Sequence, residues 1–195
     1  MSSTAQAPVR SRKTQRSVAN TVNLIMIVDT DVIKTTYGPN KGQSAAQGLN
    51  HHEGIHLICP KANYVGEANG ASDPANIIFS ANVQDYVAFW GTTISNNSDD
   101  AVIVYDVSPN SNNPNVFNDF HSDQETLTSA IVPSQPNAMP GQPATVSFYS
   151  FESKVKAKGT EAFTISFALY QIDPSDPEKQ ILYGCYYWDP TIEVK

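Results

Sequence analysis

The sequence predicts an all-β protein, an antiparallel β-sandwich of about eight or nine strands joined by long polar loops. Two observations carry this prediction. Short runs of β-branched and aromatic residues recur along the chain, and clusters of Asn, Asp, Ser, Pro and Gly separate them. No segment shows a sustained helical period of apolar residues. Short strands divided by turn residues are typical of two packed antiparallel sheets.

A single β-sandwich domain is expected from residue 21 to residue 195. The chain has 195 residues and a mass of 21.2 kDa, enough to bury a core of its own. Residues 1–20 are rich in Ser, Thr, Gln and Arg and lack apolar periodicity. We therefore expect these residues to form a disordered basic N-terminal tail.

Charge is divided unevenly between this tail and the domain. Four of the twelve basic residues lie in the first sixteen positions, namely Arg10, Arg12, Lys13 and Arg16. From Ser17 onward, eight basic and nineteen acidic residues leave a net charge of −11. Because an acidic body repels the phosphate backbone, we expect no nucleic-acid partner.

Three strands are predicted in the first 80 residues. Residues 22–29 are apolar on both faces, as in a central strand, and apolar residues alternate with polar ones at 55–59. A third apolar run begins at residues 77–79. Gly, Pro and Asn are frequent in residues 37–50, so we expect a loop there with at most one helical turn, at residues 44–46.

Two further strands, at residues 85–90 and 101–105, enclose a polar loop at residues 92–100. The loop is rich in small side chains that bear oxygen. Such side chains suit calcium or a sugar, and the nearby Trp90 could stack on a sugar ring. Turn formation through side-chain to backbone hydrogen bonds is the favoured alternative. The candidate ligand-binding residues are Trp90, Asn96, Asn97, Ser98, Asp99 and Asp100.

The second half of the chain is punctuated by proline. A strand is predicted at residues 126–132, followed by a proline-rich loop at residues 133–143. A β-bulge is expected near residues 149–150, because the apolar positions before and after it alternate with opposite phase. Residues 163–169 alternate cleanly and predict a half-buried strand.

Residues 181–188 form the expected last strand, which is rich in aromatic side chains. Tyr186 and Trp188 are therefore candidate residues of a dimer interface, where aromatic anchors are common. The alternative is that they belong to the hydrophobic core.

Cys59 and Cys185 both lie in apolar strand patterns, and two cysteines do not make a disulfide framework. We expect two buried free thiols. The sequence shows no secretory signal and no apolar stretch long enough to span a membrane. A cytoplasmic location without a membrane partner is expected.

The segment from His52 to His56 matches His-Glu-x-x-His, the pattern of zinc proteases. That chemistry needs a helix, because only then do both histidines lie on one face with the Glu as base. Gly54 lies inside the pattern, and strand entry is the better interpretation. His52, Glu53 and His56 are thus weak metal candidates, and no cofactor or catalytic residue is expected.

Several landmarks together resemble the PixA/AidA family of bacterial inclusion-body proteins. They are Ile27-Val28-Asp29-Thr30, Asn82-Val83-x-Asp85, Trp90-Gly91-Thr92, Asn97-Ser98-Asp99 with residues 102–105, and Tyr183-Gly184-x-Tyr186-Tyr187-Trp188-Asp189-Pro190-Thr191-Ile192. The resemblance implies an immunoglobulin-like sandwich, an intracellular bacterial protein without enzymatic chemistry, and expression regulated by quorum or phase. The basic tail and the content of only three methionines depart from the inclusion-forming type.

The functional hypothesis from the sequence is a non-enzymatic protein that self-associates as a homodimer through an aromatic or edge-strand surface. The alternative is a lectin-like module that binds carbohydrate through residues 96–100 and the nearby aromatic side chains.

Overall fold

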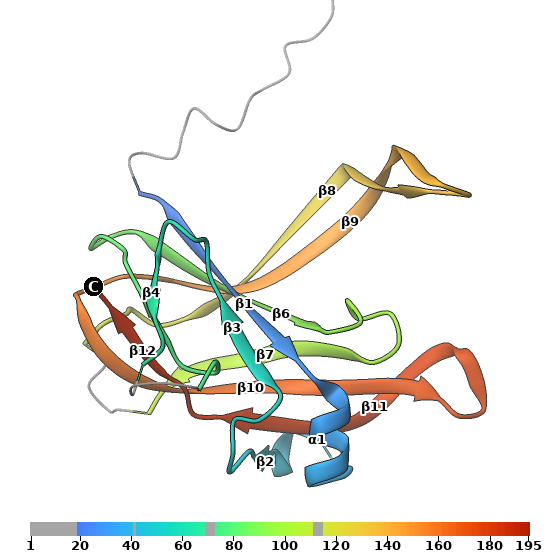
Figure 1. The fold of residues 1–195 in the computed structure, drawn as a ribbon, viewed down its shortest axis with the longest axis horizontal. Helices are drawn as coiled ribbons and strands as arrows, with labels where there is room; N and C mark the ends of the chain where they lie inside the picture. The colour runs from blue at the N-terminus through green and yellow to red at the C-terminus, as the bar shows by residue number, and fades with distance from the viewer. Residues whose placement is uncertain (1–18, 41, 69–72, 111–114) are drawn as a thin grey trace, which may run out of the picture.

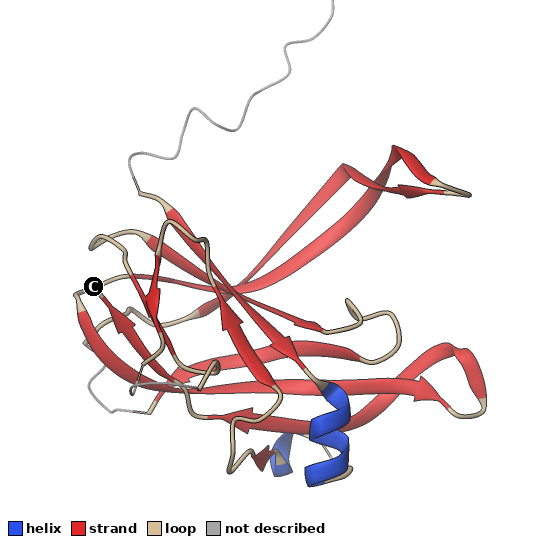
Figure 2. Ribbon diagram, in the orientation of Figure 1, coloured by secondary structure: helices blue, strands red, loops and turns tan. Residues whose placement is uncertain are grey.

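The computed structural model describes residues 19–40, 42–68, 73–110 and 115–195, and the prediction of an all-β sandwich is confirmed there. In these ranges the chain forms twelve strands in two sheets (Figures 1 and 2). The predicted tail, apart from its last two residues, lies outside the described ranges.

The first sheet has five strands. In order across the sheet they are β3 (Ile55–Ile58), β1 (Thr21–Val28), β6 (Tyr86–Thr93), β9 (Ala138–Lys154) and β8 (His121–Ser134). Strands β1 and β6 are parallel neighbours, with Ile25 opposite Trp90 and Met26 opposite Gly91. The other pairs in this sheet are antiparallel.

The second sheet has seven strands. They are β2 (Gln47–Gly48), β11 (Asp176–Trp188), β10 (Gly159–Asp173), β12 (Thr191–Val194), β5 (Ile77–Phe79) and β4 (Tyr64–Gly66) in order, with β7 (Ala101–Pro109) also paired to β10. Strand β2 is parallel to β11 and β5 is parallel to β12, so both sheets are mixed rather than purely antiparallel. Strand β12 was not predicted, because its four residues follow a Pro that reads as the end of the domain.

One α-helix, α1 (Thr30–Tyr37), follows β1 and was missed from the sequence. Asp29 caps it, since its side chain accepts a hydrogen bond from the backbone N–H of Val32. Ile33 is the one buried residue of this eight-residue helix. A single buried position gives no apolar periodicity from which a helix could be predicted. A short 3₁₀ helix, η2 (Gln43–Ala45), matches the predicted helical turn.

Two predictions about β9 are wrong. Residues 138–143, predicted as loop, are strand, and the expected bulge near residues 149–150 is absent, because Tyr149 and Ser150 pair with β8 in unbroken register. The opposite phases have a simpler cause. Phe151 points into the core opposite Phe89, while Phe148 lies on the outer face, where it packs against Trp90. Both faces of this strand carry apolar residues, so plain alternation explains the pattern.

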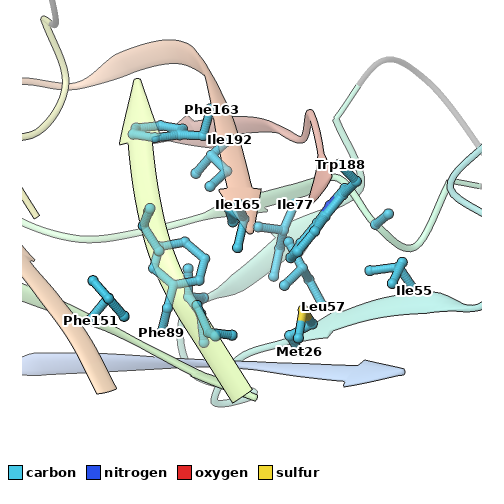
Figure 3. Close-up of a cluster of buried hydrophobic side chains, with 14 of the residues drawn as sticks. Met26, Ile55, Leu57, Ile77, Phe89, Phe151, Phe163, Ile165, Trp188 and Ile192 are labelled. Atoms are coloured by element: carbon cyan, nitrogen blue, oxygen red, sulfur yellow. The ribbon is translucent and has the colours of Figure 1, made fainter. Parts of the chain in front are cut away.

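Side chains from both sheets form one hydrophobic core (Figure 3). Met26 and Phe89 come from the five-stranded sheet, and Ile165, Trp188 and Ile192 come from the other, each at most 1% exposed. Burying a side chain of this size contributes about 1.5–3 kcal/mol. The cleanly alternating strand predicted at residues 163–169 is confirmed as the centre of β10.

Gly91 lets the two sheets approach closely. A Cβ atom at this position would lie 2.8 Å from Cγ2 of Val104 and 3.2 Å from Cε of Met26. Valine is branched at Cβ and cannot swing aside easily. The hydrogen of glycine is therefore required where β6 passes β7.

Replacing Gly91 by alanine is expected to lower the free energy of unfolding by about 1–3 kcal/mol, because the added methyl group overpacks the core. Urea denaturation measures the loss. Gly66→Ala is the matched control, since a Cβ there meets nothing within 4 Å and should change stability by about 0.5 kcal/mol or less. Equal stability of the two variants would contradict this account of Gly91.

Candidate functional site

Strands β8 and β9 leave the body of the molecule as a long two-stranded arm (Figure 1). β6 pairs with β9 only from Phe151 to Lys154, whereas β8 pairs with β9 from His121 to Ser134. We call residues 122–150 the arm. Nearly all of its side chains are exposed or half-buried.

One face of the arm is apolar from the Leu127–Val146 pair outward, while Glu125 lies opposite Phe148 at its base. Residues opposite each other in the register share a face, and Leu127 pairs with Val146 while Ala130 pairs with Ala144. Phe148 lies on the same face, two residues beyond Val146. We call this set the apolar stripe: Leu127, Ala130, Ala144, Val146 and Phe148. Leu127 is 42% exposed and Phe148 is 38% exposed, although both are large hydrophobic residues.

The arm carries no charge over most of its length. From Thr126 to Phe151 the sequence contains no Asp, Glu, Lys, Arg or His, although 16% of the whole chain is charged. Ile131 and Met139, nearer the tip, are 72% and 75% exposed. This combination of exposed apolar groups without charge is rare on a surface that faces only water.

A groove of about 760 Å³ lies in the angle between the arm and the body. Val146 and Phe148 line it on the arm side, and Ile25, Trp90 and Ile103 line it on the body side. We call it the arm groove. The Trp90 ring meets the ring of Phe148 edge to face at 6.4 Å, and its indole N–H donates to Oδ1 of Asn23 at 3.0 Å. Because this hydrogen bond and this ring contact hold the Trp90 side chain in place, the floor of the groove is preformed.

The predicted polar loop borders the same groove. Asn96 and Asn97 both line it, and both have a positive φ, 56° and 61°. Oδ1 of Asn97 accepts hydrogen bonds from the backbone N–H groups of Thr93 and Val102, at 3.0 and 3.1 Å. Asparagine tolerates this left-handed conformation better than most residues. The Asn97 side chain therefore builds the turn, as the favoured alternative predicted.

The other three predicted ligand residues lie outside the groove lining. Asp100 is buried and forms an ion pair with Lys34 of α1 at 2.5 Å. Burial of the Lys34 ammonium opposes its charged form, but the hydrogen bond and charge of Asp100 prevail and raise the pKa of Lys34. The Ser98 hydroxyl donates to the Ser95 carbonyl at 2.7 Å, and the Asp99 side chain is exposed. The structure thus brings together Trp90, Asn96 and Asn97 of the predicted set.

The prediction that Tyr186 and Trp188 form a dimer interface is wrong. Both side chains are 0% exposed within a single copy, where their rings contact Phe167 at 5.8 and 6.1 Å. The Tyr186 hydroxyl donates to the carbonyl of Gly38, and burial raises the pKa of Tyr186 far above its usual value. These aromatic residues are core residues, as the alternative held.

The weak metal candidates do not form a helix-borne pair. His52 lies in the loop before β3 and its Nδ1 contacts Oδ2 of Asp73 at 2.7 Å, while His56 is on β3. Within the described ranges, no group of three or more His, Cys, Asp or Glu side chains is placed to hold a metal ion. Cys59 and Cys185 are both free, as predicted, although Cys59 is half-buried.

No helix in the described part of the chain is long and apolar enough to cross a membrane.

The main feature of the candidate site that the sequence did not predict is the arm itself. Its signal was available as the uncharged run from Thr126 to Phe151, but the prolines within that run were read as a loop.

Comparison with known proteins places these observations in context. A family model described as PixA, inclusion body protein, matches residues 20–194. A crystal structure of an inclusion body protein (PixA) from Burkholderia cenocepacia J2315 superposes with a TM-score of 0.73 at 23% identity. The match covers 93% of this chain and 99% of that chain. A search of curated proteins found no match.

Asn97→Gly is expected to lower the free energy of unfolding by about 1–3 kcal/mol, because two backbone N–H groups lose their acceptor. Glycine accepts the positive φ, so backbone strain does not account for the loss. Chemical denaturation measures it. Asp99→Asn, at an exposed side chain of the same loop, should leave stability nearly unchanged. A neutral Asn97→Gly variant would show that the turn forms without this side chain.

Proposed function

Since the chain belongs to the PixA inclusion body protein family, we propose that it is a non-enzymatic bacterial protein whose function is to self-associate, with a homodimer as the basic unit. We place it in the cytoplasm and expect its expression to follow quorum or phase regulation, as the family resemblance implies. The single observation that supports self-association is the exposed, uncharged arm.

An isolated arm of this kind lowers the stability of a monomer. A two-stranded hairpin is only marginally stable in water unless another surface covers one of its faces. Here Leu127, Ile131 and Met139 stay exposed in a single copy. Covering them with a second copy would remove apolar surface from water at about 25 cal/mol per Å².

The size and charge of the arm both suit a protein partner. The arm, residues 122–150, has 29 residues, which is within the roughly 20–30 residues that each side of a stable interface provides. Two acidic copies repel each other, and like charges brought together at an interface cost free energy. A contact through the uncharged arm avoids that repulsion.

Leu127→Glu is expected to convert the dimer to a monomer, because it places a charge in the apolar stripe. Light scattering after size exclusion, over a concentration series, measures the mass relative to 21.2 kDa per chain. Leu182→Glu on the β10–β11 hairpin is the matched control, since Leu182 is 45% exposed against 42% for Leu127. The control should remain dimeric.

A second variant removes the outer arm altogether. Replacing residues 128–145 with Asn-Gly joins the facing pair Leu127 and Val146 by a two-residue hairpin turn. This variant should also be monomeric and folded, as judged by its circular dichroism. A wild-type chain that is a strict monomer at every concentration would overturn the proposed function.

Carbohydrate binding is the second candidate function, and one observation favours it. The arm groove brings Trp90 beside Asn96 and Tyr149, which together offer ring faces and an amide group. A glycan array with and without calcium should then show at least one bound sugar class, and Trp90→Ala should abolish its binding. An array that stays silent under both conditions contradicts this candidate.

A further inference from the structure

We propose that the outer half of one copy's arm occupies the arm groove of a second copy, and that the second copy's arm does the same in return. This inference rests on the proposed self-association and names the surface that carries it. The partner is a second copy of this chain, held by a reciprocal clasp of arms about a two-fold axis.

The apolar stripe and the groove belong to one continuous surface. On β1 and β6, Ile25 and Trp90 are direct neighbours in the register and face outward. Phe148 packs on Trp90, and Val146 and Leu127 extend the same face along the arm. The apolar surface thus begins at Ile25 and Trp90 on the body and continues along the apolar stripe of the arm. The same surface on a second copy, running in the opposite direction, would be complementary to it.

The arm is long enough to reach a second body. A strand rises about 3.3 Å per residue, so Met139 lies about 30 Å along the strand from Phe148. Two arms packed side by side in opposite directions would each place the tip beside the partner's groove. Ala130 and Ala144, facing each other midway along the arm, leave room for the two backbones to come close there.

Prolines direct the contact to the faces of the arm rather than to its edges. Pro133 lies on β8, and Pro140 and Pro143 lie on β9. Each removes a backbone N–H donor that an added strand would need. Edge-to-edge pairing of arms is therefore disfavoured, and what remains is side-chain packing of one apolar stripe against the other, with each tip in the partner's groove.

The groove offers a suitable receiving surface. On the body side of the groove, the side chains of Ile103 and Ile25 are 48% and 38% exposed to solvent. Asn96 provides an uncharged amide group at its border. An apolar, uncharged segment of the outer arm would thus meet an apolar floor with a neutral polar edge.

A mixed cross-linking experiment tests the assignment on the full chain. Both partners carry Cys59→Ser to remove the half-buried native thiol. One partner then carries Met139→Cys on the arm and the other Ile103→Cys in the groove, and the two are co-expressed and treated with a short bismaleimide. A covalent dimer is expected from the mixture and not from either variant alone. Met139→Cys paired with Ile181→Cys, on the β10–β11 hairpin, is the control and should not cross-link.

A second measurement compares the same substitution at two exposed isoleucines, Ile103 at 48% exposed and Ile94 at 66% exposed. Ile103→Glu in the groove is expected to raise the dissociation constant of the dimer about tenfold or more, since it buries a charge at the contact. Ile94→Glu, outside the groove lining, should leave that constant unchanged.

The outcomes separate this inference from the proposed function. A dimer in light scattering that neither cross-links at Ile103 nor responds to Ile103→Glu overturns the groove as the docking site and leaves self-association standing. A wild-type chain without any dimer overturns both. If the chain is monomeric and binds a glycan through Trp90, the groove is a carbohydrate site and both the clasp and self-association are wrong.

Discussion

The parallel pairing of β1 with β6 is the constraint on which both the core and the candidate site depend. Met26 and Gly91 face inward from this pair, where Gly91 admits Val104 of the neighbouring strand. Ile25 and Trp90, one residue earlier on each strand, face outward and form the floor of the arm groove. Because alternate residues point to opposite faces, one register fixes the closure of the sandwich and the shape of the groove together.

Strand β9 connects two environments that differ in stability. From Phe151 to Lys154 it is paired with β6 and contributes Phe151 to the core. Beyond Ser150 toward its start, it has β8 as its paired neighbour and carries the apolar stripe on its outward face. The core can hold the base of the arm rigidly, but it cannot cover the outer half. The free energy that would be gained by covering that half is available only to another molecule.

Local pattern predicted the buried strands well, and tertiary context explains most of the errors. The alternation at residues 163–169 and the turn built by Asn97 were readable, because the signal lies within a few residues. Tyr186 and Trp188 were ambiguous, since aromatic side chains suit cores and interfaces equally. Pro133, Pro140 and Pro143 suggested a loop, yet an arm with two free edges tolerates proline where a central strand does not. The parallel partner of β1 is remote in sequence and left no local trace.

The geometry of a reciprocal clasp also limits what the arm alone can build. Two arms that filled two grooves about a two-fold axis would leave no arm or groove unoccupied, so the proposed assembly would close at two copies. The prolines along the arm oppose the open-ended strand pairing that leads to fibres. The net charge of −11 on the body from Ser17 onward would further keep such closed dimers apart. Growth from the proposed dimer to a dense inclusion would therefore require a second contact surface outside the arm, one that operates when the repulsion between bodies is screened by salt or offset by opposite charge.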